Sequence, residues 1–167
     1  RAATLHVLNW RYVAFGSEYG NPFEPPSPLR HFWSLSIEEQ FYLAFPIVVL
    51  GCVAMSRRRG VRLPLAIVSV TGLAVSIGLQ LRFDSLSRGY FGTDTRMGEM
   101  CIGVLAALVL DRWTALTHRR AQWMGILGVA LVGVPIATVG LGSVWLFRGT
   151  FTVVGLGTAL LIASCTR

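Results

Sequence analysis

The sequence contains no lysine, and charged residues make up only 14% of its 167 positions. Hydrophobic residues account for 53%, which lies outside the range of ordinary soluble domains. Segment length argues against the large buried core of a soluble protein. Residues 63–81 and 121–141 each supply about 20 nearly uncharged residues, enough at about 1.5 Å per residue to cross a hydrocarbon layer of about 30 Å. The sequence therefore predicts a polytopic membrane protein.

Cysteine is scarce as well. Cys52, Cys101 and Cys165 all lie in apolar segments, without paired spacing or neighbouring histidines. This pattern speaks against a zinc site and against a disulfide framework, because both require cysteines at defined spacings. We expect all three to be small buried residues, and we expect no metal site.

The apolar runs predict an all-α fold, a transmembrane helix bundle of about five spans plus the tail of a sixth. We place the spans roughly at residues 36–56, 63–81, 95–111, 121–141 and 149–165, with the tail before residue 16. The loop GSEYGNPFEPPSPLR, residues 16–30, is too rich in proline and glycine for regular structure. Because the chain opens without methionine and stops behind an apolar run, we expect residues 1–167 to be a fragment of one membrane-embedded domain.

The net charge of +7 comes wholly from arginine. A soluble nucleic-acid-binding protein is one interpretation, and solubility without detergent would test it. We favour an explanation from topology, because the arginines gather in the short loops 56–62 and 111–120, and such loops mark the cytoplasmic side. We therefore expect no nucleic-acid partner, cytoplasmic arginine-rich loops, and residues 16–35 and 82–95 on the extracytoplasmic side.

The segment HFWSLSIEEQFY, residues 31–42, places the adjacent carboxylates of Glu38 and Glu39 directly before a long apolar run. Glu39 lies 18 residues before Arg57, about 27 Å along a helix, so both carboxylates fall near the outer edge of the hydrocarbon. Exposure of a charge to lipid costs a few kcal/mol. The carboxylates are therefore expected to face the bundle interior, a water-filled cavity or a partner.

Arg96 is the expected partner. It lies 15 residues before Asp111, about 22 Å along a helix and hence at a similar depth, and we expect it to pair with Glu38 or Glu39. Glu99 competes, because it stands three residues after Arg96 on the same helical face.

Several of these residues also have a purely structural interpretation. Ser36 and Glu39 fit the S-x-x-E capping box, in which each side chain bonds the backbone of the other. Trp33 and Tyr42 suit a membrane interface. His31 is a lone histidine before the helix, and spacing alone does not assign it a role.

The segment HFWSLSIEEQFYLAFP resembles the signature of the acyltransferase 3 family of integral-membrane O-acyltransferases. In that signature a histidine, one variable residue and W-S-L-S-x-E-E-Q-F-Y lead into a transmembrane helix. LNWRY, residues 8–12, and TDTRMGEMCIGVLAA, residues 93–107, also resemble segments of the family, and the last part of the chain matches only as generic apolar helices.

The resemblance implies a membrane-spanning helix bundle that transfers an acyl group, usually acetyl from acetyl-CoA on the cytoplasmic side. The acceptor is a hydroxyl of a cell-surface glycan or of another extracytoplasmic or lipid-linked molecule. No cofactor is expected to stay bound, since acyl-CoA is the donor substrate. The resemblance also implies a location in a bacterial-type plasma (inner) membrane, with the lipid bilayer as the other partner. The family's first helices, with their histidine and arginine motifs, are missing here and His31 does not replace that histidine, so the fragment alone is expected to be inactive.

A sugar hydroxyl needs a base, and the developing oxyanion needs positive charge or hydrogen-bond donors. The expected catalytic residues are Glu38, Glu39 and His31. The expected substrate-binding residues are Trp33, Ser34, Ser36, Gln40, Tyr42, Arg96 and Glu99. The alternative is a non-catalytic membrane module or degenerate fragment associated with polysaccharide export, in which the buried charges serve helix association alone.

Overall fold

The computed structural model describes residues 7–15, 32–56, 60–82, 86–111, 117–140, 143, 145 and 148–166. Its helices are α1 (Leu8–Phe15), α2 (Phe32–Ser56), α3 (Arg62–Arg82), α4 (Leu86–Phe91), α5 (Thr93–Leu110), α6 (His118–Thr138) and α7 (Thr150–Cys165). No strand occurs among these residues, which confirms the predicted all-α fold.

The five longest helices coincide with the five predicted spans, but they are not equivalent. Three of them, α2, α3 and α6, combine the length and the apolar composition that a membrane crossing needs, and they support an integral membrane protein. In contrast, α5 carries Asp94, Arg96 and Glu99 near its start. The last helix, α7, has 16 residues, and its length of about 24 Å is shorter than a hydrocarbon layer of about 30 Å. The number of full crossings is therefore approximate.

Two helices differ by about one turn from the rough bounds of the predicted spans. Helix α6 ends at Thr138, three residues beyond Pro135, instead of at residue 141. Helix α2 begins at Phe32 instead of residue 36. Ser36 consequently lies inside α2, where its hydroxyl donates to the carbonyl of Phe32 at 2.9 Å. The predicted capping box of Ser36 and Glu39 is therefore wrong, because Ser36 is no longer at the helix start.

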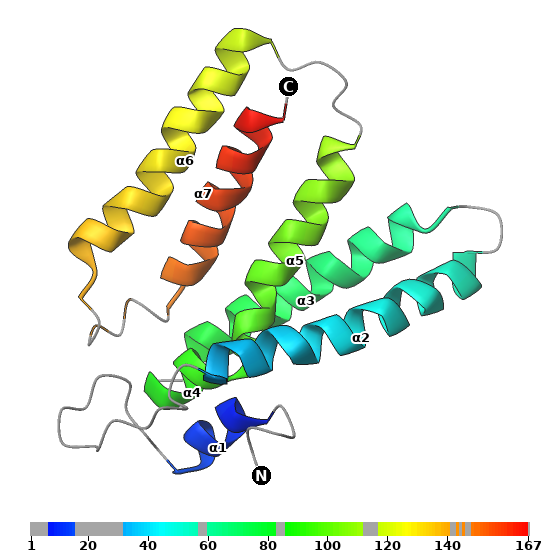
Figure 1. The fold of residues 1–167 in the computed structure, drawn as a ribbon, viewed down its shortest axis with the longest axis vertical. Coiled ribbons are helices and arrows are strands. Elements are labelled where there is room, and N and C mark those ends of the chain that lie inside the picture. Colours follow the sequence, from blue (N-terminus) through cyan, green and yellow to red (C-terminus); the bar gives the residue numbers. More distant parts are fainter. Residues whose placement is uncertain are drawn as a thin grey trace.

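The long helices pack mainly as a series of neighbours: α6 lies along α7, α7 lies beside α5, and α5 lies along α3 (Figure 1). Helix α2 makes fewer contacts with the other long helices. Close approach depends on glycine at two crossings. A Cβ on Gly128 would lie 2.8 Å from the carbonyl oxygen of Gly157, and a Cβ on Gly98 would lie 2.7 Å from the hydroxyl of Ser76. Small residues at helix crossings are typical of membrane bundles.

Polar side chains are among the most deeply buried of the bundle, and many large apolar side chains are exposed on its surface. The largest fully buried side chains are those of Gln80, Asn9, Thr95 and Ser76. Large apolar side chains such as Leu43 and Met55 are 75% and 83% exposed. A soluble protein would show the reverse, whereas lipid favours hydrogen bonds inside and apolar groups outside.

The cysteines differ in their surroundings. Cys52 is buried, Cys101 is half-buried and Cys165 is exposed, and all three are free thiols. The expectation that all three are buried is thus wrong for Cys165, which lies at the last residue of α7.

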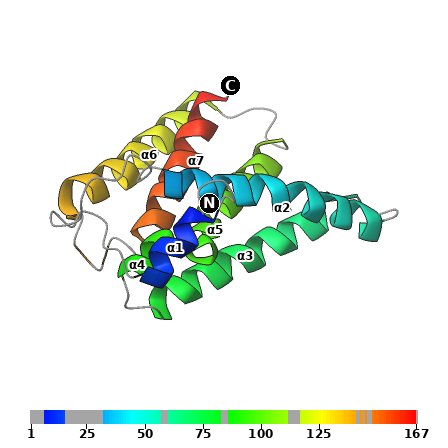
Figure 2. The same cartoon turned by 60° about the horizontal axis from the view of Figure 1, so that its bottom comes forward.

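The two short helices α1 and α4 lie together at the end of the bundle where α5 begins (Figure 2). At the opposite end of α5, Arg62 at the start of α3 forms an ion pair with Asp111, just after the end of α5. The described residues that border the two arginine-rich loops, Arg62 and Asp111, therefore lie at the same end of the bundle. Arg57, Arg58 and Arg59 lie outside the described residues.

Candidate active site

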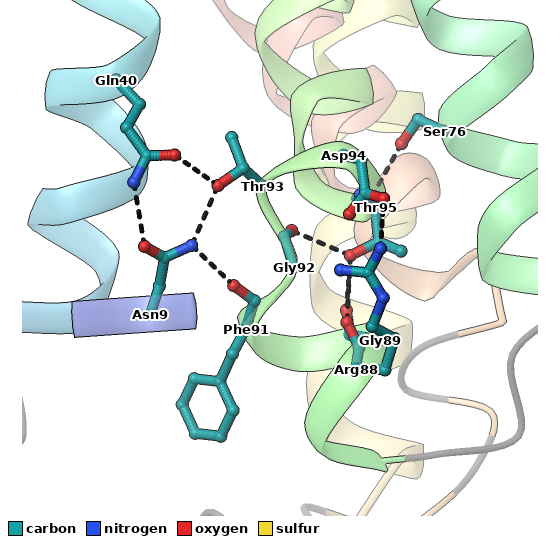
Figure 3. Close-up of polar contacts among 10 residues, drawn as sticks. All are labelled: Asn9, Gln40, Ser76, Arg88, Gly89, Phe91, Gly92, Thr93, Asp94 and Thr95. Carbon is teal, nitrogen blue, oxygen red and sulfur yellow. Dashed lines mark hydrogen bonds and ion pairs between the residues drawn. The ribbon is translucent and has the colours of Figure 1, made fainter. Parts of the chain in front are cut away.

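A network of amide and hydroxyl groups fixes the first turns of α2 against the start of α5 (Figure 3). The side-chain amide of Asn9 donates to the carbonyl of Phe91 at 3.0 Å and to the hydroxyl of Thr93 at 2.9 Å. Gln40 donates to the side-chain carbonyl of Asn9 at 3.0 Å and accepts from Thr93 at 2.6 Å. Helix α1 is thereby joined to α2 and to the turn between α4 and α5.

A second set of bonds holds the start of α5 against α3 (Figure 3). The backbone carbonyl of Thr95 accepts from Ser76 at 2.7 Å and from Gln80 at 2.6 Å. The hydroxyl of Thr95 donates to the carbonyl of Gly92 at 2.9 Å, and Asp94 pairs with Arg88 at 2.5 Å. Because these bonds surround residue 95, they fix the backbone from which the side chain of Arg96 extends.

Trp33 anchors the beginning of α2. It is buried, and its ring centroid lies 4.7 Å from that of Tyr90 and 5.1 Å from that of Phe91. Such tilted and edge-on aromatic contacts stabilise a fixed arrangement. The indole ring of Trp33, an expected substrate-binding residue, is therefore packed largely against aromatic side chains of the protein itself.

A cavity of about 810 Å³ opens between α2, α5 and the start of α3. One end of this cavity, which we call the α2–α5 cavity, is polar and is lined by Ser34, Glu38, Arg96 and Glu99. Its middle is apolar, with side chains such as Phe41, Phe45 and Val104, and the Arg62–Asp111 ion pair lines its other end. The cavity therefore follows most of the length of α5.

Arg96 pairs with Glu99 across one turn of α5, with 3.3 Å between Nε and Oε2. The expected pairing of Arg96 with Glu38 or Glu39 is not the ion pair that forms, and the competing local partner prevails. The Arg96 guanidinium also stacks on the ring of Phe151, with its central carbon 3.7 Å from the ring centroid. Nη1 of Arg96 and Oε1 of Glu99 are buried and have no hydrogen-bond partner among the described residues.

Some of the predicted site residues line the α2–α5 cavity, and others do not. Those that line it are Trp33, Ser34, Glu38, Tyr42, Arg96 and Glu99. Tyr42 is 66% exposed and keeps a free face. Ser36, Glu39 and Gln40 do not line it: Ser36 bonds within its helix, and Gln40 belongs to the network around Asn9. His31 lies outside the described residues.

Several contributors to the site were missed from the sequence. Phe151 of α7 lies beneath Arg96, and Arg62 and Asp111 line the far end of the cavity. A signal existed for Asn9, which belongs to the LNWRY segment, but its partners lie at positions 40, 91 and 93. In the part of the chain that the structure describes, no group of three His, Cys, Asp or Glu converges on a metal-sized site.

Comparison with known proteins gives concordant matches. The model of the acyltransferase 3 family, described as an acyltransferase domain, matches residues 3–167. O-acetyltransferase OatA of Staphylococcus aureus strain NCTC 8325 is 33% identical over 171 residues, covering 97% of this chain and 28% of that protein. A putative O-acetyltransferase of Staphylococcus aureus strain COL is 29% identical over 176 residues, covering 98% of this chain and 28% of that protein. The chain thus spans 28% of the length of these curated relatives. No solved structure matches.

Proposed function

Because this chain belongs to the acyltransferase 3 family, we propose that it forms part of an integral-membrane enzyme that transfers an acetyl group to a hydroxyl. The donor is acetyl-CoA, supplied from the cytoplasm. The acceptor is a hydroxyl of a cell-surface glycan or of another extracytoplasmic or lipid-linked molecule. The relatives that carry the name O-acetyltransferase support this choice of acyl group.

One observation carries the proposal: the signature carboxylate Glu38 and the Arg96–Glu99 pair line the same end of one cavity. Arg96 and Glu99 come from the later segment of resemblance, residues 93–107, which is far from the signature in the sequence. Transfer of an acyl group requires a base for the hydroxyl and a donor for the oxyanion. The cavity offers one of each.

In the proposed reaction, Glu38 takes the proton of the acceptor hydroxyl while that oxygen attacks the carbonyl carbon of the thioester. The new C–O bond forms, the carbonyl oxygen becomes negative, and Nη1 of Arg96 donates to it. The C–S bond then breaks, the carbonyl reforms, and the CoA thiolate leaves and takes up a proton. Glu99 holds Arg96 through Nε and leaves Nη1 for the substrate, which is consistent with the absence of a described partner for that nitrogen.

Glu38 is favoured over Glu39 as the base because Glu38 lines the cavity and Glu39 does not. Adjacent residues on a helix point about 100° apart, so both carboxylates cannot serve one reacting bond equally. Tyr42, exposed on the same lining, offers a flat face to a sugar ring in place of Trp33.

The length of the cavity suits a donor that arrives from the cytoplasm. Arg96 and Asp111 are 15 positions apart in the sequence, about 22 Å along a helix. The Asp111 end is the arginine-rich end, which we assign to the cytoplasmic side. The pantetheine arm of acetyl-CoA would lie along the apolar middle of the cavity, and its thioester carbonyl would then reach Arg96.

The test uses the full-length protein in membranes, with radiolabelled acetyl-CoA and a panel of glycans. We expect acetyl transfer to at least one hydroxyl acceptor. Glu38→Gln should lower the rate on the order of 10² to 10⁴-fold, because glutamine keeps the shape but cannot accept the proton. The matched variant Glu39→Gln should stay near the wild-type rate.

Two results would count against the proposal. Absence of acetyl transfer by the wild-type protein would favour a non-catalytic module in polysaccharide export. Near-normal rates for both glutamine variants would remove the carboxylate base.

A further inference from the structure

A second cavity, of about 420 Å³, lies between α5 and α7, which neighbour one another along much of their length (Figure 1). We call it the α5–α7 slot. It is lined at one end by Arg96, Glu99 and Phe151, and further along by residues that include Gly155 and Ala159. Arg96, Glu99, Gly103 and Ala107 line both this slot and the α2–α5 cavity. The two spaces therefore meet at the Arg96–Glu99 pair.

The mostly apolar lining of the slot favours an apolar ligand. Apart from Arg96 and Glu99, its one polar lining residue is Thr158, and the Thr158 hydroxyl donates to the carbonyl of Val154 at 2.9 Å. A sugar or a charged group placed in the slot beyond Arg96 and Glu99 would lose its hydration without gaining partners, which is unfavourable. An unbranched hydrocarbon chain would lose nothing by entering it.

Small side chains keep the slot open. Gly103, Ala106, Gly155 and Ala159 form much of its lining. A Cβ on Gly155 would lie 3.3 Å from Cδ1 of Ile102 and 3.5 Å from Cγ of Glu99. Even one added methyl group would therefore constrict the slot close to the Arg96–Glu99 pair.

We propose that the α5–α7 slot holds the hydrocarbon tail of the acyl group whose carbonyl is bound by Arg96. This inference rests on the proposed function. The donor is then an acyl thioester that includes chains longer than acetyl. We prefer the acyl donor to a membrane lipid as the molecule that supplies the hydrocarbon chain. The slot begins at the guanidinium of Arg96, and the same guanidinium lines the α2–α5 cavity that contains Glu38. Continuity at Arg96 and Glu99 places the head of such a chain at the reacting position.

The depth of the slot should also determine which lengths of acyl chain the enzyme accepts. Ala159 is one helical turn beyond Gly155 on α7, about 6 Å further from the Arg96–Glu99 pair. Narrowing at Gly155 should therefore affect short chains as well as long ones. Narrowing at Ala159 should affect only chains long enough to reach it.

The experiment measures kcat/KM of the full-length protein in membranes with acetyl-CoA, butanoyl-CoA and octanoyl-CoA. We expect the wild-type protein to use all three. Ala159→Leu should lower the octanoyl-to-acetyl ratio about 10-fold or more, and Gly155→Ala should lower both the butanoyl-to-acetyl and the octanoyl-to-acetyl ratio. The control Val153→Leu, on α7 but outside the slot lining, should keep the wild-type ratios.

The outcomes separate this inference from the proposed function. If no acyl-CoA is used, the proposed function itself fails. Acetyl transfer with rejection of butanoyl and octanoyl chains, or unchanged ratios in both slot variants, would overturn the slot and leave acetyl transfer standing. Gly155→Ala adds a single methyl group, so it remains a usable test if Ala159→Leu does not fold. Unchanged ratios together with loss of a co-purified lipid from the slot variants would assign the slot to a bilayer lipid.

Discussion

Removal of the Asn9 side chain should destabilise the junction of α1, α2 and α5. Asn9 is fully buried and takes part in hydrogen bonds with Phe91, Thr93 and Gln40 at 2.9 to 3.0 Å. Hydrogen bonds between helices in membrane proteins contribute about 0.6 kcal/mol on average and at most about 1.7 kcal/mol. Three such bonds give roughly 2 kcal/mol, with an upper bound of about 5 kcal/mol.

The assay is reversible unfolding of the full-length protein in detergent micelles, followed by tryptophan fluorescence, since Trp10 and Trp33 lie close to the junction. Asn9→Ala should lower the free energy of unfolding by about 2 kcal/mol or more. Val7→Ala is the matched control, because Val7 lies two residues away and is 40% exposed. It should change the free energy by less than about 0.5 kcal/mol.

A free energy of unfolding for Asn9→Ala within about 0.5 kcal/mol of wild type would refute the reasoning. It would mean that the network around Gln40 does not hold α2 in place. The position of Gln40 in the signature would then need a role at the substrate after all.

Three further predictions concern packing, the site and topology. Gly98→Ala should destabilise the protein by about 1–3 kcal/mol, because its Cβ would lie 2.7 Å from a serine hydroxyl of α3; an unchanged denaturation midpoint would contradict this. Arg96→Lys should lower the acyl-transfer rate about 10²-fold, because lysine cannot bind Glu99 and the substrate through separate nitrogens; a wild-type rate would exclude Arg96 from oxyanion binding. In a background without other cysteines, Thr117→Cys and Gly140→Cys, both exposed at opposite ends of α6, should be labelled from the cytoplasmic and the outer side respectively. Labelling of both from one side would show that α6 does not cross the membrane.

Hydropathy was sufficient to predict where the long helices lie. A run of apolar residues determines a helix in lipid almost by itself, because every backbone group must find its partner within the segment. Helices α2, α3 and α6 follow this rule. The start of α2 did not, because the S-x-x-E pattern at Ser36 and Glu39 is compatible both with a helix start and with a helix interior.

The ion pair of Arg96 shows that similar depth in the membrane does not determine which residues come into contact. Similar depth made contact with Glu38 feasible, but contact also depends on how far α2 lies from α5, and α2 has little contact with α5. The i,i+3 partner Glu99 requires no packing between helices. The prediction of the distant pair gave too much weight to similar depth and too little to the i,i+3 spacing within one helix.

The hydrogen bonds between polar residues far apart in the sequence could not be predicted either, because they also depend on how the helices pack against one another. The bonds that join Asn9 to Gln40 and Thr93 depend on the rotation and register of three helices. A single sequence specifies these only through packing. The comparison with relatives identified the family, whereas the cavity between α2 and α5 became visible only in three dimensions.

The central claim is that Glu38 and Arg96 act on one substrate in one cavity, and a double-mutant cycle on the acyl-transfer rate tests it most directly. Glu38→Gln and Arg96→Lys are each expected to lower kcat/KM for acetyl-CoA and a glycan acceptor by about 10²-fold or more. If both residues serve the same transition state, the double variant should lose little more than the more damaged single variant. A loss in the double variant equal to the product of the two single losses, about 10⁴-fold, would show that the residues act independently and would contradict the shared site.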